Sequence, residues 1–191
     1  MSTKIELKDF ELQKIKAGEK SIHIQYFNAK NRNDLVSIDS DSKPSEDLIA
    51  KVNLLSEVFA KSLGLLRGWE HSRDHIKKND EALKIAMNEY QIEIDRCKIT
   101  GFSLVGGEGN EGVKITGVLE TDYGKIGIPS GIIKFDDVDL GAEVEAIIEE
   151  ITSEVYLFLF KGKRDNDLFN QKPKPQTSET EGLGSSTLKA V

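Results

Sequence analysis

Three glycines near the middle of this chain have the spacing of a nucleotide-binding loop. Gly107, Gly109 and Gly112 match the letters of the dinucleotide fingerprint. In that motif the glycines bring the backbone close to a pyrophosphate at the first turn of a helix. Here the next residues, 113–119, alternate between apolar and polar side chains as a strand does. The sequence therefore predicts a glycine-rich hairpin loop, with no cofactor bound there.

Other groups have residue types that bind metals or act as nucleophiles. His71 and His75 lie four residues apart, as zinc ligands on one helix face do. A structural zinc site takes four ligands, however, and no second pair stands at metal spacing. Asp136, Asp137 and Asp139 have no accompanying base and fit the start of a helix, where Asp139 is the predicted N-cap. Cys97 has no activating partner in the sequence, so we expect no metal site and no catalytic constellation, and hence a protein that is not an enzyme.

The N-terminal segment has a charge that suits a polyanion. Residues 1–33 hold seven bases and four acids, a net charge of +3, whereas the whole chain carries −7. Aromatic side chains among lysines on a sheet can stack on unpaired bases while the lysines contact phosphates. The candidate nucleic-acid contacts are Lys14, Lys16, Lys20, His23, Gln25, Phe27, Lys30 and Arg32. The alternative is that Phe10 belongs to the core and that the lysines protect an edge strand from pairing.

A second candidate surface lies near the C-terminus. Lys163 and Arg164 are followed by two acids and then by Leu168 and Phe169. A short charged and apolar peptide on a tether can dock in a groove of a partner protein. The alternative is that the two apolar residues fold back onto the core. Residues 166–191 are rich in Pro, Ser, Thr and Gly, which predicts a disordered tail.

The elements that would position these residues repeat in order. Residues 4–15, 21–27 and 34–39 read as strands, with a break near Lys8, and residues 45–66 read as an amphipathic helix. After a helical connector, residues 98–105, 113–119 and 125–135 read as strands, and residues 140–161 as a second long helix. Within that connector, residues 79–89 are predicted helical and 92–95 lead into the next strand. We expect a bend or an edge at Pro129, which has no N–H to donate.

This order predicts one α+β domain, residues 1–165, in which two long amphipathic helices pack against antiparallel sheet. The halves 1–66 and 97–165, joined by a connector at 67–96, have the order of a duplicated βββα unit. One cysteine, no signal-like segment and no apolar stretch of membrane-spanning length predict a cytoplasmic protein without a membrane partner. Exposed strand edges leave a homodimer open.

Several short motifs resemble those of a phage protein family. The likeness rests on a few segments. They are the hairpin that begins at Lys14, the strands Ile99–Ser103 and Val113–Gly117, and a closing Gly162–Arg164 followed by Leu168-Phe169. The chain resembles small uncharacterised proteins of tailed bacteriophages that end in a Gly-Lys-Arg…Leu-Phe segment. This family usually has Ala-Gln after Gly-Lys-Arg, whereas Asp165 and Asn166 stand here. The resemblance implies a protein of the host cell cytoplasm that acts beside replication or recombination.

Two hypotheses of function follow. The first is a non-enzymatic phage accessory protein that binds nucleic acid, single-stranded DNA above all, with a host or phage replication protein as partner. The second is an acidic protein-interaction module that inhibits or redirects a host factor through the acids of the 140–161 helix.

Overall fold

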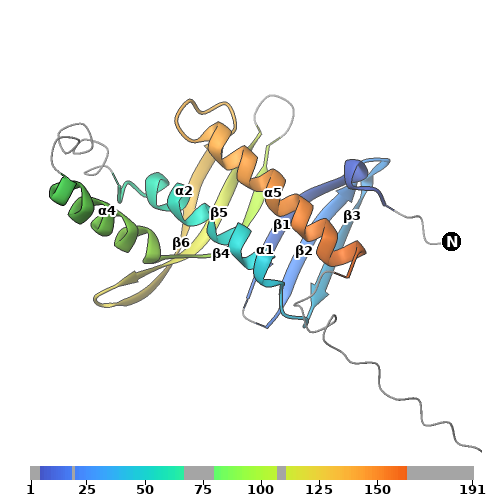
Figure 1. Cartoon of the computed structure of the whole chain (residues 1–191). Helices are drawn as coiled ribbons and strands as arrows, with labels where there is room; N and C mark the ends of the chain where they lie inside the picture. The colour runs from blue at the N-terminus through green and yellow to red at the C-terminus, as the bar shows by residue number, and fades with distance from the viewer. Residues whose placement is uncertain (1–4, 19, 67–79, 107–110, 163–191) are drawn as a thin grey trace, which may run out of the picture.

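The protein is built on one six-stranded antiparallel sheet with the strand order β3-β2-β1-β4-β5-β6 (Figure 1). The computed structural model describes residues 5–18, 20–66, 80–106 and 111–162. The strands are β1 (Phe10–Ala17), β2 (Ile22–Asn28), β3 (Asn31–Ser40), β4 (Cys97–Val105), β5 (Gly112–Thr121) and β6 (Gly124–Lys134). The helical elements are η1 (Leu7–Asp9), α1 (Glu46–Asn53), α2 (Leu55–Ser62), α4 (Asp80–Asp95) and α5 (Gly141–Phe160). The predicted α+β class with an antiparallel sheet is confirmed.

Alternating side chains explain the strands. In β2, Ile22, Ile24 and Tyr26 are buried and the residues between them are partly exposed. The first strand starts later than predicted, because Leu7–Asp9 form a 3-10 turn just where the apolar parity changes. The ladder between β1 and β2 also shifts register between Leu12 and Lys14, so Gln13 is an extra residue. The 3-10 turn and the β-bulge together therefore accommodate the change in apolar parity along this segment.

The helices begin and end with recognisable caps, though not all as predicted. Ser45 caps α1, since its hydroxyl accepts the Leu48 N–H at 3.3 Å. The predicted Asp139 N-cap is wrong, because the Asp137 carboxylate accepts the N–H groups of Asp139 and Leu140 and α5 starts one residue later. Gly162, at φ +66°, follows the end of α5 as a helix-terminating glycine does.

Two predicted boundaries differ from the structure. The single helix expected over residues 45–66 is divided at Leu54 into α1 and α2. The helix expected to end at Glu89 continues to Asp95, so the predicted lead-in to the next strand is the last turn of α4. No helix within the described residues has the length and apolar character that crossing a membrane requires.

Helices α1, α2 and α5 all lie on one side of the sheet (Figure 1). Phe59 of α2, Ile151 of α5 and Ile115 of β5 are fully buried between the two layers. At the end of α5, Phe160 packs with Phe10 and Tyr26 in an aromatic cluster. The core therefore fills the space between these helices and one face of the sheet, and none of these three helices covers the opposite face.

The two halves of the sheet meet at a short junction between β1 and β4. Only three residue pairs join them, Lys14 with Ser103, Ile15 with Phe102 and Lys16 with Gly101. A side chain at Gly101 would place its Cβ 2.1 Å from the Ile15 carbonyl oxygen. Gly101 also has φ +156°, a conformation that L side chains rarely adopt. The junction therefore requires glycine at this position.

Several predicted features lie outside the described residues. They are His71 and His75, the loop that contains Gly107 and Gly109, the partner-binding candidates Lys163, Arg164, Leu168 and Phe169, and the tail at 166–191.

Candidate nucleic-acid interface

The open face is the side of the sheet opposite the helices, and its residues are placed by the register of the strands. One row crosses the sheet as Ser37, Gln25, Lys14, Ser103, Lys114 and Ile132. The next row runs from Asp39 through His23, Lys16 and Gly101 to Thr116. Because directly paired residues share a face, each row marks side chains that project to the same side.

Besides Lys125, which pairs with Glu120, five lysines of the described strands project from the open face. They are Lys14 and Lys16 of β1, Lys98 of β4, Lys114 of β5 and Lys134 of β6. All but Lys14, which is half-buried, are exposed. Lys14 and Lys114 stand two strands apart, about 10 Å, and Lys14 and Lys16 are about 7 Å apart along one strand. The lysines therefore form a charged field that spans four adjacent strands.

Three acids of the described strands lie on this face. Asp39 accepts a hydrogen bond at 2.6 Å from Nδ1 of His23. Glu120 forms an ion pair with Lys125 at 2.9 Å, and this pair holds the pKa of the Glu120 carboxyl below its ordinary value. Glu11 is the third acid, opposite Phe27. The open face therefore carries an excess of positive charge.

A shallow hollow of about 650 Å³ lies on this face where β1, β2, β4 and β5 meet. Lys16 and His23 line it on one side, and Thr100 and Thr116 line it on the other. The two threonine hydroxyls donate to backbone carbonyls, of Thr116 and Gly101 respectively. Because those hydroxyl protons are engaged, and because Asp39 and Asp41 also line the hollow, Lys16 is the group in this lining that is suited to contact a phosphate.

The structure brings five of the eight predicted contacts together. Lys14, Lys16, His23, Gln25 and Phe27 all project from the open face of β1 and β2. Phe27 is partly exposed beside Leu35, its partner on β3. An aromatic ring is thus available for stacking next to the lysines.

The remaining predicted contacts lie elsewhere. Lys20 is exposed in the turn that follows β1. Lys30 forms an ion pair with Asp9 at 2.7 Å, away from the lysine field, and the side chain of Arg32 is not among those described. Phe10 is 4% exposed, so it belongs to the core, as the alternative reading had it.

Sequence reasoning missed Lys98, Lys114 and Lys134. Lys98 and Lys114 each lie between buried residues of their strands, and Lys134 follows the buried Ile133. The alternation of side chains along a strand does not show which strands pair. The pairing of β4 with β1 is what joins the N-terminal and C-terminal strands into one surface.

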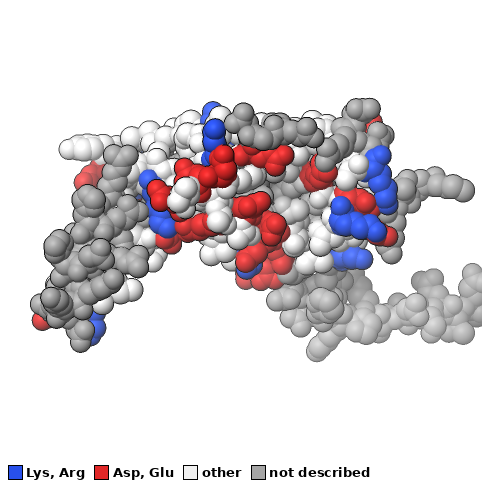
Figure 2. Space-filling model, turned by 90° about the horizontal axis from the view of Figure 1, so that it is seen from above, with Lys and Arg blue, Asp and Glu red and all other residues white. Residues whose placement is uncertain are grey.

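The helix side of the molecule has the opposite charge. Seen from above, Asp and Glu form a band across the middle of the molecule (Figure 2). Glu145, Glu149 and Glu150 are exposed on α5, which runs along the top in Figure 1. Glu150 also forms an ion pair with Lys51 of α1. A polyanion would be repelled from this side and attracted to the other.

Cys97 lies in the core, on the side of β4 that faces the helices. Burial raises the pKa of the Cys97 thiol, which keeps it in the less reactive protonated form. Within the described residues, no three His, Cys, Asp or Glu side chains converge on one point. Comparison of the chain with protein-family models, with curated proteins and with solved structures finds no match.

Proposed function

We propose that this protein binds single-stranded nucleic acid, DNA above all, on the open face of its sheet and performs no catalysis itself. The observation that supports this most directly is the field of five lysines on a face that the described helices leave uncovered. Lysines neutralise phosphates, bases can stack on Phe27, and sugars can contact the hollow beside Lys16.

The geometry favours a single strand over a duplex. The lysines are spread over four strands of a broad sheet face, and none of the helices α1, α2 and α5 lies on that face to enter a groove. A flexible single strand can follow a broad sheet surface and present its bases to an aromatic ring. With the phage resemblance, this supports a role beside replication or recombination in the host cytoplasm.

The first test is a salt titration of binding to labelled single-stranded and double-stranded oligonucleotides, followed by fluorescence anisotropy. We expect tighter binding to the single strand. In the triple variant Lys14→Ala, Lys16→Ala and Lys114→Ala, the slope of log affinity against log salt should fall by about 2, because each phosphate contact contributes about 0.7.

The matched control removes three exposed lysines from other parts of the molecule, Lys8, Lys84 and Lys161. Because both triple variants change the net charge equally, a loss confined to the first locates the interface. Equal losses in both variants would show binding by overall charge alone, and no binding by the unaltered protein at low salt would reject the function.

A second function is favoured by the acidic band over α5 (Figure 2). It is docking of a basic surface of a host protein, which the chain would inhibit or redirect. Reversing the charges of Glu149 and Glu150 should abolish capture of that protein. Reversal of Glu81 and Asp122, exposed acids of other elements, should leave it intact. Capture that survives the first pair of changes would remove this candidate.

A further inference from the structure

His23 lies on the open face between an acid and a lysine. It is the one histidine of the chain that the structure describes, and its register partners are Lys16 of β1 and Asp39 of β3. Histidine is the side chain whose charge ordinarily changes between about pH 5 and pH 8. A change of pH in this range therefore changes the charge of this row at His23.

A hydrogen bond to Asp39 determines which ring nitrogen of His23 takes up the proton. Nδ1 lies 2.6 Å from Oδ1 of Asp39. An ionised carboxylate only accepts hydrogen bonds, so Nδ1 carries a hydrogen and donates it. In the neutral ring the second nitrogen, Nε2, then has a lone pair and is an acceptor. Protonation of the ring takes place at Nε2 and turns this acceptor into a donor.

The position of His23 in the sheet leaves Nε2 to the hollow beside Lys16. Strand β2 lies between β3 and β1, so Asp39 and Lys16 are on opposite sides of His23. Because the two nitrogens are at opposite edges of the imidazole, Nε2 is directed away from Asp39. His23 lines the hollow together with Lys16. We therefore expect a phosphate bound by Lys16 to meet Nε2.

The charged groups around His23 come from both neighbouring strands. Strand β1 supplies Lys14 and Lys16, and β3 with the residue after it supplies Asp39 and Asp41, whereas β4 and β5 line the hollow with threonines, which carry no charge. The lysines oppose a further positive charge and the carboxylates favour it. Once Nε2 is protonated, His23 and Asp39 form a pair without net charge, so a negative charge close to Lys16 is neutralised.

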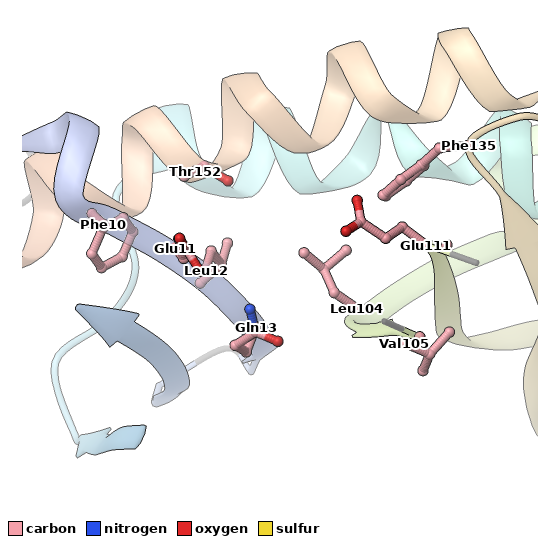
Figure 3. Close-up of a pocket in the computed structure, with 11 residues that line it drawn as sticks. Phe10, Glu11, Leu12, Gln13, Leu104, Val105, Glu111, Phe135 and Thr152 are labelled. Atoms are coloured by element: carbon pink, nitrogen blue, oxygen red, sulfur yellow. The ribbon is translucent and has the colours of Figure 1, made fainter. Parts of the chain in front are cut away.

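The cavity between β1 and β4 lacks such an arrangement in the part of its lining that the structure describes. Its volume is about 380 Å³, its lining includes the carboxylates of Glu11 and Glu111, and no histidine, lysine or arginine is among the described lining residues (Figure 3). Carboxylates repel a polyanion. Of these two hollowed regions, the one beside Lys16 is therefore where a proton can strengthen the binding of a phosphate.

We propose that His23 makes the affinity of the open face for single-stranded DNA depend on pH, an inference that rests on the proposed function and adds its regulation. With Nε2 protonated, the imidazole donates to a phosphate oxygen beside Lys16. With Nε2 unprotonated, it is an acceptor and cannot bind that oxygen. One proton is taken up at Nε2 as the contact forms and is released when the contact breaks, so the affinity rises as the pH falls.

The test measures the fluorescence anisotropy of a labelled oligothymidylate of about 15 nucleotides with the full chain. Thymine takes up no proton in this pH range, so the DNA itself does not change. At constant low salt, we expect binding to be about fivefold tighter at pH 5.5 than at pH 7.5, at the lower end of the usual coupling between two ligands. The variant His23→Gln should lose this difference, because an amide keeps a donor for Asp39 but takes up no proton.

The chain offers a matched control in its other two histidines, His71 and His75. The double variant His71→Gln and His75→Gln removes two imidazoles and keeps His23, so it should retain the fivefold difference. This comparison separates an effect of His23 from a general gain of positive charge at low pH.

A second measurement uses the unaltered protein, so it does not depend on the folding of a variant. NMR signals of the histidine rings, with that of His23 assigned by its absence in His23→Gln, are followed against pH with and without the oligonucleotide. Because coupling between two ligands is reciprocal, a fivefold effect of the proton on DNA binding requires that DNA move the midpoint of the His23 titration upward by about 0.7 pH unit.

The possible failures are distinguishable. No binding of the oligonucleotide at either pH would reject the proposed function and this inference with it. Equal binding at both pH values, a pH effect that His23→Gln retains, or a His23 midpoint that DNA does not move would overturn the inference and leave the proposed function standing.

Discussion

Gly101 shows how a single residue holds the two halves of the sheet together. Its missing side chain allows β4 to approach the Ile15 carbonyl and Lys16 of β1, where a Cβ would meet atoms at 2.1 and 2.9 Å. Both contacts are with backbone, which cannot turn away as a side chain can. The positive φ of Gly101 adds to the constraint.

Gly101→Ala is therefore expected to reduce the free energy of unfolding by about 3 kcal/mol, since backbone strain and steric overlap act together. Chemical denaturation at neutral pH measures the change. Gly127→Ala is the control, because nothing lies within 4 Å of the added Cβ, and it should stay within about 0.5 kcal/mol of the unaltered protein. A similar cost at both positions would contradict the close approach.

At the scale of elements, one partly buried cluster of charges ties three helices together. Lys61 of α2 forms ion pairs with Glu57 at 2.9 Å and with Glu143 of α5 at 3.0 Å, and Tyr90 of α4 donates to Glu57 at 2.5 Å. Partial burial alone would raise the pKa of the Glu57 carboxyl. The hydrogen bonds from Tyr90 and Lys61 outweigh it and hold that pKa below its ordinary value.

Burial alone would lower the pKa of Lys61, but its two carboxylate partners raise it well above the ordinary lysine value. A lowered carboxyl pKa gives stability that is present above the unfolded value, about 4.3, and is lost as the pH falls. A raised ammonium pKa gives stability that is present below about 10.4 and is lost above it. The cluster therefore stabilises the fold between these limits.

Lys61→Met should cost about 2 kcal/mol at pH 7, because it leaves two partly buried carboxylates without their cation. Urea unfolding between pH 3 and pH 7 should also show that the variant gains less stability than the unaltered protein as the pH rises. Lys84→Met, at an exposed site on α4, is the control. Parallel pH profiles for all three proteins would show that the cluster is not a source of stability.

Local pattern predicted most of the elements but not every boundary. Alternating apolar residues identified all six strands, and three- and four-residue spacing identified the helices. Asp137 and Asp139 are both residue types that cap a helix, and the sequence alone does not show which of them caps α5. The backbone turn before the helix decides this, and it places the Asp137 carboxylate on the N–H groups of Asp139 and Leu140. The division of the first long helix at Leu54 was not predicted, because no glycine or proline stands there.

At the scale of the whole molecule, the candidate interface depends on long-range pairing that local pattern does not contain. Lys14 and Lys114 become neighbours only because β1 pairs with β4 in the middle of the sheet. The same pairing gathers lysines of both halves on one face, although the net charge of the chain is −7. Composition alone argues against a polyanion partner, whereas the distribution of charge supports one.

This distribution predicts that ionic strength will affect the two sides differently. Glu145→Gln together with Glu149→Gln should raise affinity for single-stranded DNA about twofold at 20 mM salt and have no effect at 150 mM, because charges across the molecule are screened beyond about 8 Å at the higher salt. The oligonucleotide titration measures both. A persistent effect at 150 mM would place the DNA on the helix side.

The short junction between β1 and β4 also has a consequence for the order of folding. The hairpins within residues 10–40 and within 97–134 close short loops, whereas Lys16 and Gly101 are separated by 85 positions. Long loops close slowly, so each three-stranded meander is expected to form before the two join. Interactions made after the rate-limiting step govern unfolding more than folding, so Gly101 and its neighbours would set the lifetime of the native state.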